Sequence, residues 1–310
     1  MLSKMRVRDG NASSASVASG MGFLIPSIVH LTFKSTNVPQ TILHNVQRNM
    51  KRCSMCEFRF YTDDDVDVFL RANFDDAVYG AFRSINGTYG AMKADFFRYC
   101  VLYKVGGIYA DIKSSINCRL FSLIEKSDRC ILDVPRATWE PWRRLPGLQT
   151  FEQWVLIFAA GHPYLGNMIR QMCQTIQSRS VPRKIPMRVR PTAKDKVLFM
   201  TGPDAFSRAV KDVIAKAKRG SALQHRCVNY DGKFSHVGRG CTNYKAMYKI
   251  NEAVHYSECT APFFIKTSVP ETRECEHRSA SLPERETTCA HSPLSSTGGM
   301  ALVRAGSPGT

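Results

Sequence analysis

The sequence predicts an α/β fold in which helices flank a mostly parallel sheet within a single domain. Apolar, β-branched runs of strand length alternate with helix-like segments, which is typical of parallel sheets. The strongest helical segment passes through Gly106-Gly107 directly into a strand. The chain has 310 residues, of which 44% are hydrophobic, and this is enough for one large α/β domain.

The predicted strands are short apolar segments. Residues 23–33 (FLIPSIVHLTF) are apolar and β-branched, which indicates a buried first strand. Residues 57–62 alternate between polar and apolar side chains and indicate a second strand. Residues 108–112 and 131–134 are expected to form a third and a fourth. In such sheets, ligands bind at the carboxyl ends of the strands.

The predicted helices are recognised by their end signals. A helix is expected at 39–50 because a proline opens it. The aspartates at 63–65 form an N-cap cluster for a helix over 66–72. The strongest helix covers 90–104. Residues 181–196 are basic and interrupted by proline, so we expect a loop that is solvated or receives an anionic acceptor.

Composition divides the chain into three parts. Residues 1–22 are rich in Ser, Gly and Asn, and residues 268–310 are rich in Ser, Thr, Pro, Glu and Arg. Neither segment has an apolar period, so a disordered arm and a disordered tail are expected. The folded domain is predicted at 23–267.

Charge and cysteine content restrict the partners. The 43 Lys and Arg residues against 26 Asp and Glu give a formal net charge of +17, which favours anionic partners such as nucleotide phosphates. No basic motif interleaved with aromatic residues is present, so no nucleic-acid partner is expected. The 11 cysteines show no disulfide framework, and the Cys53–Cys56 pair lacks the second pair that zinc needs. No signal peptide or transmembrane segment is recognised, which favours a cytoplasmic location.

The segment 90–104 carries a polar pair on a helix. Its apolar positions predict one stripe that packs on the sheet, made of Met92, Phe96, Tyr99 and Tyr103. Asp95 and Arg98 are three residues apart on the flank of this stripe and are therefore neighbours. On a half-buried helix such a pair can grip sugar hydroxyls. Spacing alone favours the simpler alternative, a structural ion pair.

The strand after this helix ends in Asp111. A carboxylate is thereby delivered to the carboxyl end of a central strand, where an α/β active site is expected. There it can bind a divalent cation that bridges a nucleotide diphosphate.

Several motifs in order give a specific resemblance. The run A-x-K-A-D-x-x-R-Y-x-x-L-Y-x-x-G-G-I-Y-x-D at 91–111 resembles the DXD-motif sugar-binding glycosyltransferases. This retaining family includes initiating α-1,6-mannosyltransferases and inositol phosphorylceramide mannosyltransferases. I-P-x-I-x-H-x-T-x-K at 25–34 and F-Y-T-D at 60–63 are similar to its opening strands, and G-H-P at 161–163 and T-G-P at 201–203 to its later landmarks.

The resemblance implies a GT-A-type, Rossmann-like fold and a hexosyltransferase. The donor would be GDP-mannose or a UDP-hexose, and the sugar would pass with retention to a hydroxyl of a glycan, glycolipid or protein. By motif position, the catalytic residues would be Asp95, Arg98 and Asp111. The donor would contact these three together with His30, Thr32, Tyr109 and Lys113. Asp111 would ligate Mn²⁺ or Mg²⁺. His255 would complete the metal shell or bind phosphate, and the alternative is a surface histidine on a strand.

One position departs from the family pattern: Lys113 replaces the second Asp of D-x-D. Three interpretations follow. Asp111 and a later residue hold the metal while Lys113 contacts phosphate, or the ammonium replaces the cation at the leaving diphosphate, or activity is lost. Retained activity is favoured because the sugar-contact pair and the Gly-Gly strand are intact.

Several further residues have two interpretations each. Tryptophan faces stack on sugars but more often belong to a core; this applies to Trp139, Trp142 and Trp154. Glu140 and Glu152 are carboxylates that can assist an acceptor hydroxyl.

The alternatives to an enzyme are a catalytically inactive sugar-nucleotide or glycan-binding relative and, less favoured, a basic nucleic-acid-binding protein. Family members are often Golgi membrane proteins, so peripheral membrane contact is a further expectation for this chain.

Overall fold

The structure is a computed structural model that describes residues 2–5, 22–133, 150–185, 191–217, 225–236 and 259–265. The chain divides after Ser268 into two units, and all of these residues lie in the first. Within the predicted disordered arm, Leu2–Met5 form a short 3-10 helix, η1, whose Leu2 is buried. The division of the chain into arm, domain and tail stays a prediction.

A six-stranded sheet lies at the centre, in the order β2-β1-β3-β6-β5-β7. Its strands are β1 (Ile28–Thr32), β2 (Glu57–Tyr61), β3 (Gly107–Ala110), β5 (Cys130–Asp133), β6 (Val155–Phe158) and β7 (Arg226–Val228). β6 is antiparallel to both of its neighbours, and the other pairs are parallel. The predicted α/β class with a mostly parallel sheet is confirmed. A separate two-stranded sheet pairs β4 (Ser114–Ile116) with β8 (Phe234–His236).

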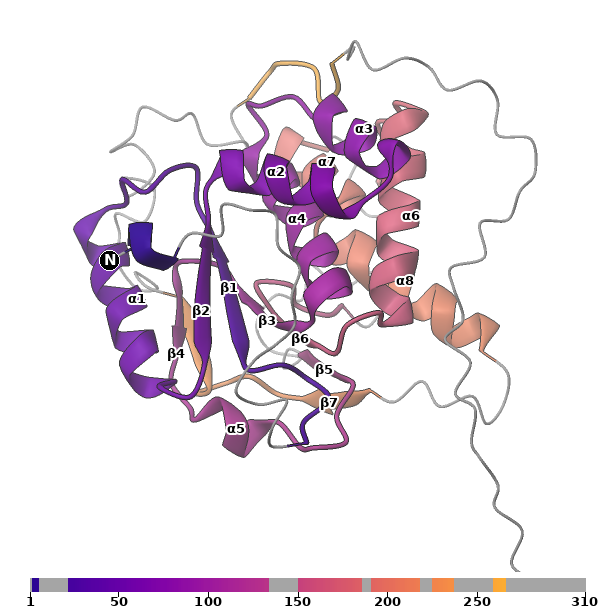
Figure 1. The fold of residues 1–310 in the computed structure, drawn as a ribbon. Coiled ribbons are helices and arrows are strands. Elements are labelled where there is room, and N and C mark those ends of the chain that lie inside the picture. The colour runs from indigo at the N-terminus through magenta and orange to yellow at the C-terminus, as the bar shows by residue number, and fades with distance from the viewer. Residues whose placement is uncertain are drawn as a thin grey trace, which may run out of the picture. The chain divides into compact units, whose positions relative to one another are not determined.

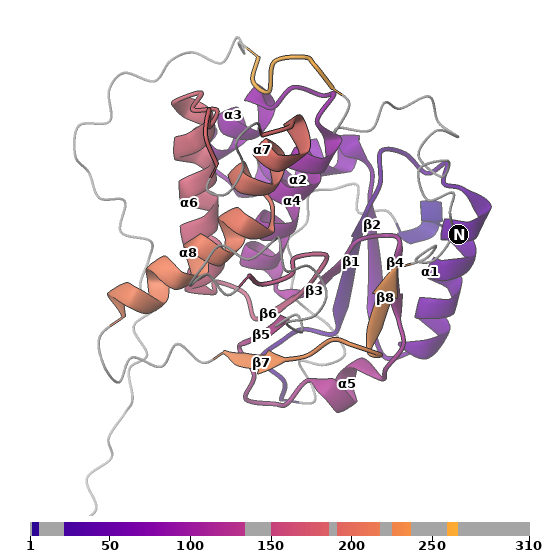
Figure 2. The same cartoon turned by 180° about the vertical axis from the view of Figure 1, so that it is seen from behind.

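Helices cover both faces of the sheet (Figures 1 and 2). One face carries α1 (Gln40–Arg52), α5 (Leu120–Leu123) and the β4–β8 pair, which share a core with Val29 and Leu31 of β1. The opposite face carries the remaining helices: α2 (Asp63–Asn73), α3 (Asp76–Ser84), α4 (Gly90–Val105), α6 (Pro163–Gln177), α7 (Ala193–Met200) and α8 (Pro203–Lys216). Both faces of the sheet can be covered because successive side chains of a strand point to opposite faces.

The first predicted strand is shorter than expected. β1 begins at Ile28 instead of residue 23, because Pro26 has no N–H to donate to a ladder. Ile25 is nevertheless fully buried, so the preceding segment contributes to the core as a loop. None of the described helices combines the length and the apolar character that a membrane crossing requires.

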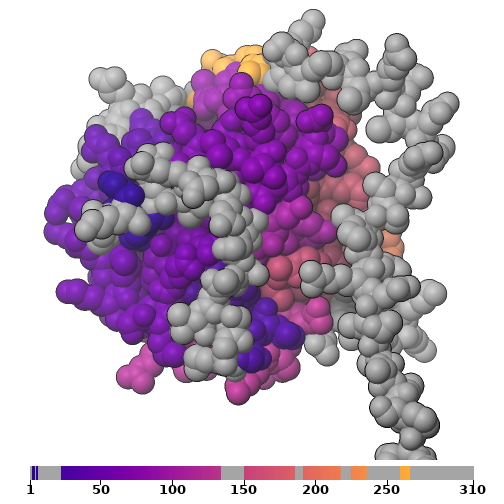
Figure 3. All heavy atoms as spheres, viewed as in Figure 1, coloured from indigo at the N-terminus to yellow at the C-terminus, as the bar shows by residue number. Residues whose placement is uncertain are grey.

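Helix α4 is enclosed and does not have the predicted single apolar stripe. Successive side chains such as Phe96-Phe97 and Cys100-Val101 are all buried, so burial runs around the helix. The helix packs on β3 and β6 and is covered by α2 and α6. Figure 3 shows that side chains of the indigo-to-purple N-terminal half cover much of the surface on this side. The prediction of a half-buried helix is therefore wrong.

Two helix starts also differ from the predictions. The N-cap of α2 is Thr62, which forms a capping box with Asp65, so the aspartate cluster lies inside the first turn. Thr192 and Asp195 form the same box at the start of α7. A loop over all of 181–196 is therefore wrong, because the last four residues of that range are helical.

Candidate active site

Asp111 lies directly after β3, at the edge of the sheet where the sequence placed it. Its backbone N–H donates to the Trp154 carbonyl at 2.8 Å, and its carbonyl accepts from the Ser114 N–H at 2.6 Å. These bonds fix the backbone, while 22% of the side chain is exposed. The result is a carboxylate held at the carboxyl end of a central strand, the usual ligand position in α/β sheets.

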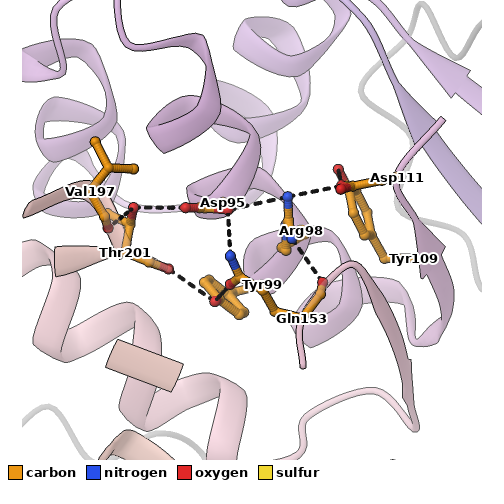
Figure 4. Close-up of polar contacts among 8 residues, drawn as sticks. All are labelled: Asp95, Arg98, Tyr99, Tyr109, Asp111, Gln153, Val197 and Thr201. Carbon is orange, nitrogen blue, oxygen red and sulfur yellow. Dashed lines mark hydrogen bonds and ion pairs between the residues drawn. The ribbon is translucent and has the colours of Figure 1, made fainter. Parts of the chain in front are cut away.

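Arg98 connects two carboxylates (Figure 4). Its Nη2 lies 3.2 Å from Asp95 Oδ1 and 3.0 Å from Asp111 Oδ1. Its Nη1 donates to the Gln153 carbonyl at 2.8 Å, and its guanidinium lies 4.7 Å from the centre of the Tyr109 ring. The side chains of Asp95 and Arg98 are each 6% exposed. A chain of charges thus runs from a buried pair to the partly exposed Asp111.

The structure adds Gln153, Thr201 and Tyr99, none of which was predicted from the sequence to be functional. Gln153 Nε2 donates to Asp95 Oδ1 at 3.0 Å, and its side-chain oxygen accepts from the Tyr99 hydroxyl. Thr201 Oγ1 donates to Asp95 Oδ2 at 2.8 Å, and its carbonyl accepts from Tyr99 at 3.0 Å. Thr201 belongs to the T-G-P landmark, which was a signal for it. Gln153 had no such signal.

At Asp95 and at Arg98, burial and the neighbouring groups have opposite effects on the pKa. Burial raises the pKa of Asp95 to about 7, although Arg98, Thr201 and Gln153 stabilise its ionised form. Burial disfavours the charge on Arg98, but Tyr109, Asp111 and Asp95 outweigh it and hold the pKa of Arg98 above its usual range. Arg98 is therefore a permanent cation, whereas Asp95 takes up a proton more readily than an exposed aspartate does.

The contacts between Asp95 and Arg98 are those of the structural ion pair that the spacing favoured. The pair also extends to Asp111, which a simple structural pair does not require. Contact of either residue with a donor sugar stays a prediction.

His30 lies in the core and holds the Gly-Gly turn. Its Nε2 is 2.9 Å from the Gly106 carbonyl, and its Nδ1 is 3.2 Å from the Tyr61 hydroxyl. A neutral ring satisfies both contacts, because Nε2–H donates and Nδ1 accepts. Burial lowers the pKa of His30 to about 3. Its side chain is fully buried, so these contacts are structural, and the predicted donor contact stays a prediction.

We expect His30 to make the protein less stable in mild acid. Its folded-state pKa lies below the unfolded value of 6.5, so the unfolded chain binds the proton more tightly, and stability falls as the pH drops below 6.5. The loss should be about 1.4 kcal/mol per pH unit. Urea unfolding of the wild type and of His30→Gln at several pH values between about 7 and about 5 measures how steeply the free energy of unfolding depends on pH in each protein. His44→Gln, on the exposed face of α1, is the control for loss of an imidazole, and an equal change of slope in both variants would contradict the role of His30 burial.

The remaining predicted residues are spread around Asp111. Tyr109 donates its hydroxyl to Asp111 Oδ1 at 3.4 Å, and Thr32 at the end of β1 donates to the Tyr61 carbonyl at 3.1 Å. Lys113 is half-buried two residues after Asp111. Trp154 packs edge-on against Phe234, as a core tryptophan does. Glu152 is half-buried beside Gln153. The other predicted positions lie outside the described residues: Trp139, Glu140, Trp142 and His255.

Of the two predicted metal ligands, Asp111 lies within the described residues and His255 does not. No group of three or more His, Cys, Asp or Glu side chains with metal-binding geometry occurs in the described part of the chain. Asp111 Oδ1 already accepts from Arg98, and the next motif position is a cation, Lys113. Ca²⁺ and Mg²⁺ need several oxygen ligands, and binding of Mn²⁺ or Mg²⁺ by Asp111 and His255 stays a prediction.

A charged cluster at the carboxyl edge of a mostly parallel sheet is the arrangement of a ligand-binding α/β protein. Residues 32–128 match the model of the family described as a glycosyltransferase sugar-binding region containing a DXD motif. The resemblance seen in the sequence is thereby confirmed. Asp95, Arg98 and Asp111 all lie within the matched segment.

Individual proteins show the same similarity. The chain is 25% identical over 156 residues to inositol phosphoceramide mannosyltransferase 3 of Schizosaccharomyces pombe, a match that covers 50% of this chain and 39% of that protein. It is 29% identical over 134 residues to the initiation-specific alpha-1,6-mannosyltransferase of the same yeast, covering 40% and 32%. The matches thus span 32% to 39% of the length of these relatives. Among solved structures, the PaToxG glycosyltransferase aligns with a TM-score of 0.43 at 15% identity, over 62% of this chain and 70% of that one.

Proposed function

We propose that this chain is a nucleotide-sugar-dependent glycosyltransferase. It moves a hexose from GDP-mannose or a UDP-hexose to a hydroxyl of a glycan, glycolipid or protein, with retention at the anomeric carbon. The observation that carries the proposal is the chain of charges from Asp95 through Arg98 to Asp111, which ends at the carboxyl edge of β3. The family match over the same residues and the mannosyltransferase names of the relatives support it.

The proposed roles follow from exposure. Asp111 reaches solvent and contacts the donor, whereas Arg98 is buried and fixes the position of one Asp111 oxygen. Asp95 compensates the charge of Arg98 from the other side. Groups held in place before the substrate arrives stabilise a developing charge without reorganisation. The buried pair therefore supports catalysis mainly by orienting Asp111.

Lys113 gives the proposal its most specific chemistry. An ammonium near Asp111 can neutralise the leaving diphosphate as a fixed charge. The alternative is that Asp111 and His255 hold Mn²⁺ or Mg²⁺ while Lys113 contacts phosphate. The net charge of +17 is compatible with an anionic acceptor or an anionic membrane surface.

A second candidate function is binding of a nucleotide sugar without turnover. The observation that favours it is Lys113, since the family motif has an acidic residue at that position.

A donor screen with and without metal tests both functions. Thermal stability and donor hydrolysis of the full chain are measured with GDP-mannose, UDP-glucose, UDP-galactose and UDP-N-acetylglucosamine, each with Mn²⁺ and with EDTA. A donor at a hundred times its Kd should stabilise the protein by about 2.7 kcal/mol. Hydrolysis that persists in EDTA supports Lys113 as the diphosphate cation, and hydrolysis that only Mn²⁺ restores rejects it. Stabilisation without hydrolysis favours the non-catalytic binder, and no response to any donor contradicts both functions.

A further inference from the structure

The Asp95 carboxylate is held by hydrogen bonds from two distant segments. The side-chain amide of Gln153, just before β6, donates to Oδ1, and the hydroxyl of Thr201, in the turn between α7 and α8, donates to Oδ2. Figure 4 shows both donors and Arg98 converging on this one side chain. The residue is 4% exposed, so the protein rather than bulk water solvates it.

Arg98 by itself does not fully compensate Asp95. Its Nη2, a terminal NH2 group with two hydrogens, faces both Asp95 Oδ1 and Asp111 Oδ1, so the same group serves two carboxylates. A buried carboxylate without enough donors becomes protonated. Hydrogen bonds to a charged group are stronger than those between neutral groups. The two neutral donors are therefore well placed to keep Asp95 ionised.

We propose that Thr201 and Gln153 are positioning residues that keep Asp95 ionised and paired with Arg98, and thereby fix Asp111. This inference rests on the proposed function for its effect on turnover. A protonated Asp95 no longer attracts the guanidinium, so Arg98 loses the anchor on its buried side. The T-G-P turn then controls the donor site although Thr201 itself does not touch the donor.

The charged and titratable groups around Asp95 are consistent with this assignment. Arg98 favours the ionised form and Asp111 opposes it, and Thr201 and Gln153 favour it through hydrogen bonds. The neighbouring phenols are Tyr99 and Tyr109, whose pKa values burial raises, so they stay neutral. Because burial already raises the pKa of Asp95 and the two donors oppose that shift, loss of one donor should raise the pKa further.

The test is Thr201→Val, which removes the hydroxyl and keeps the shape. Loss of a hydrogen bond to a charged group should raise the Asp95 titration by about one to two pH units. The acidic limb of the kcat/KM profile for donor hydrolysis should move upward by the same amount, with activity recovering at alkaline pH. Thr201→Ser keeps the hydroxyl and should stay close to the wild type. Thr175→Val is the matched control, because both threonines bond a carbonyl four residues back, and Thr175 is not among the partners of Asp95.

A second readout is independent of turnover. Carbon-13 NMR of aspartate carboxyl groups, assigned with Asp95→Asn, reports the Asp95 titration directly. If no donor is hydrolysed, the proposed function fails while the NMR shift still decides the positioning role. An unchanged Asp95 titration in Thr201→Val, or an equal shift in Thr175→Val, overturns the inference. If Thr201→Val does not fold, Gln153→Leu provides the same test, because it removes the other hydrogen bond to Asp95.

Discussion

Gly107→Ala is expected to destabilise the protein by about 3 kcal/mol or more. Gly107 has φ of +101°, a backbone conformation that side chains rarely adopt. A Cβ there would lie 2.6 Å from the Ile28 carbonyl oxygen and 3.4 Å from His30 Nε2. The oxygen is backbone of the neighbouring strand β1, so it cannot move aside as a side chain can. Either the β1–β3 pairing shifts or the turn before β3 rearranges, and urea unfolding measures the cost.

Gly161→Ala separates the two causes. Gly161 has φ of +71°, and no atom lies within 4 Å of a Cβ at that position. Its substitution should lower the free energy of unfolding only because of the positive φ, by about 1 to 2 kcal/mol. If Gly107→Ala costs no more than Gly161→Ala, the close approach to Ile28 does not restrain the turn.

The same turn shows what could be predicted from the sequence. The glycine pair, the helix before it and the strand after it form one continuous segment, so local spacing places Asp95, Arg98 and Asp111 near each other. The alternation of strands and helices similarly predicts the α/β class. In each case the deciding information lies between neighbours in the chain.

The parts that could not be predicted depend on distant contacts. Gln153 and Thr201 reach Asp95 across 58 and 106 residues, and no local pattern records these distances. β6 was missed because its four apolar residues are too few to show a period. The burial of α4 on all sides over residues 95–102 was missed because a single stripe describes a helix on a surface, whereas this helix is covered from two sides.

Burial also changes which residue should matter most for the chemistry. The sequence presents Asp95, Arg98 and Asp111 as comparable members of one motif. The structure leaves the first two side chains 6% exposed and the third 22% exposed. A change at Asp111 should therefore affect the donor directly, while a change in the buried pair also disturbs the core around α4.

Asp111→Asn is accordingly expected to lower kcat/KM for donor hydrolysis by about a hundredfold to a thousandfold. The substitution keeps the size of the side chain and removes the charge that faces the donor. Arg98 keeps Asp95 as its ionic partner and the Gln153 carbonyl as an acceptor, so no guanidinium is left uncompensated in the core. The free energy of unfolding should therefore change by only about 1 kcal/mol. Donor hydrolysis and urea unfolding of the same preparation separate the two effects.

Asp67→Asn provides the matched control for this prediction. Asp67 on α2 also pairs with an arginine and a tyrosine, at 3.2 Å from Arg83 and 2.9 Å from Tyr79, and 31% of its side chain is exposed. The two substitutions remove the same charge from the same kinds of partners, so they should differ in activity and agree in stability. A comparable loss of hydrolysis in both variants would point to net charge rather than to the position of Asp111. Full activity in Asp111→Asn would remove this carboxylate from the donor site and leave Arg98 bridging two carboxylates for structural reasons alone.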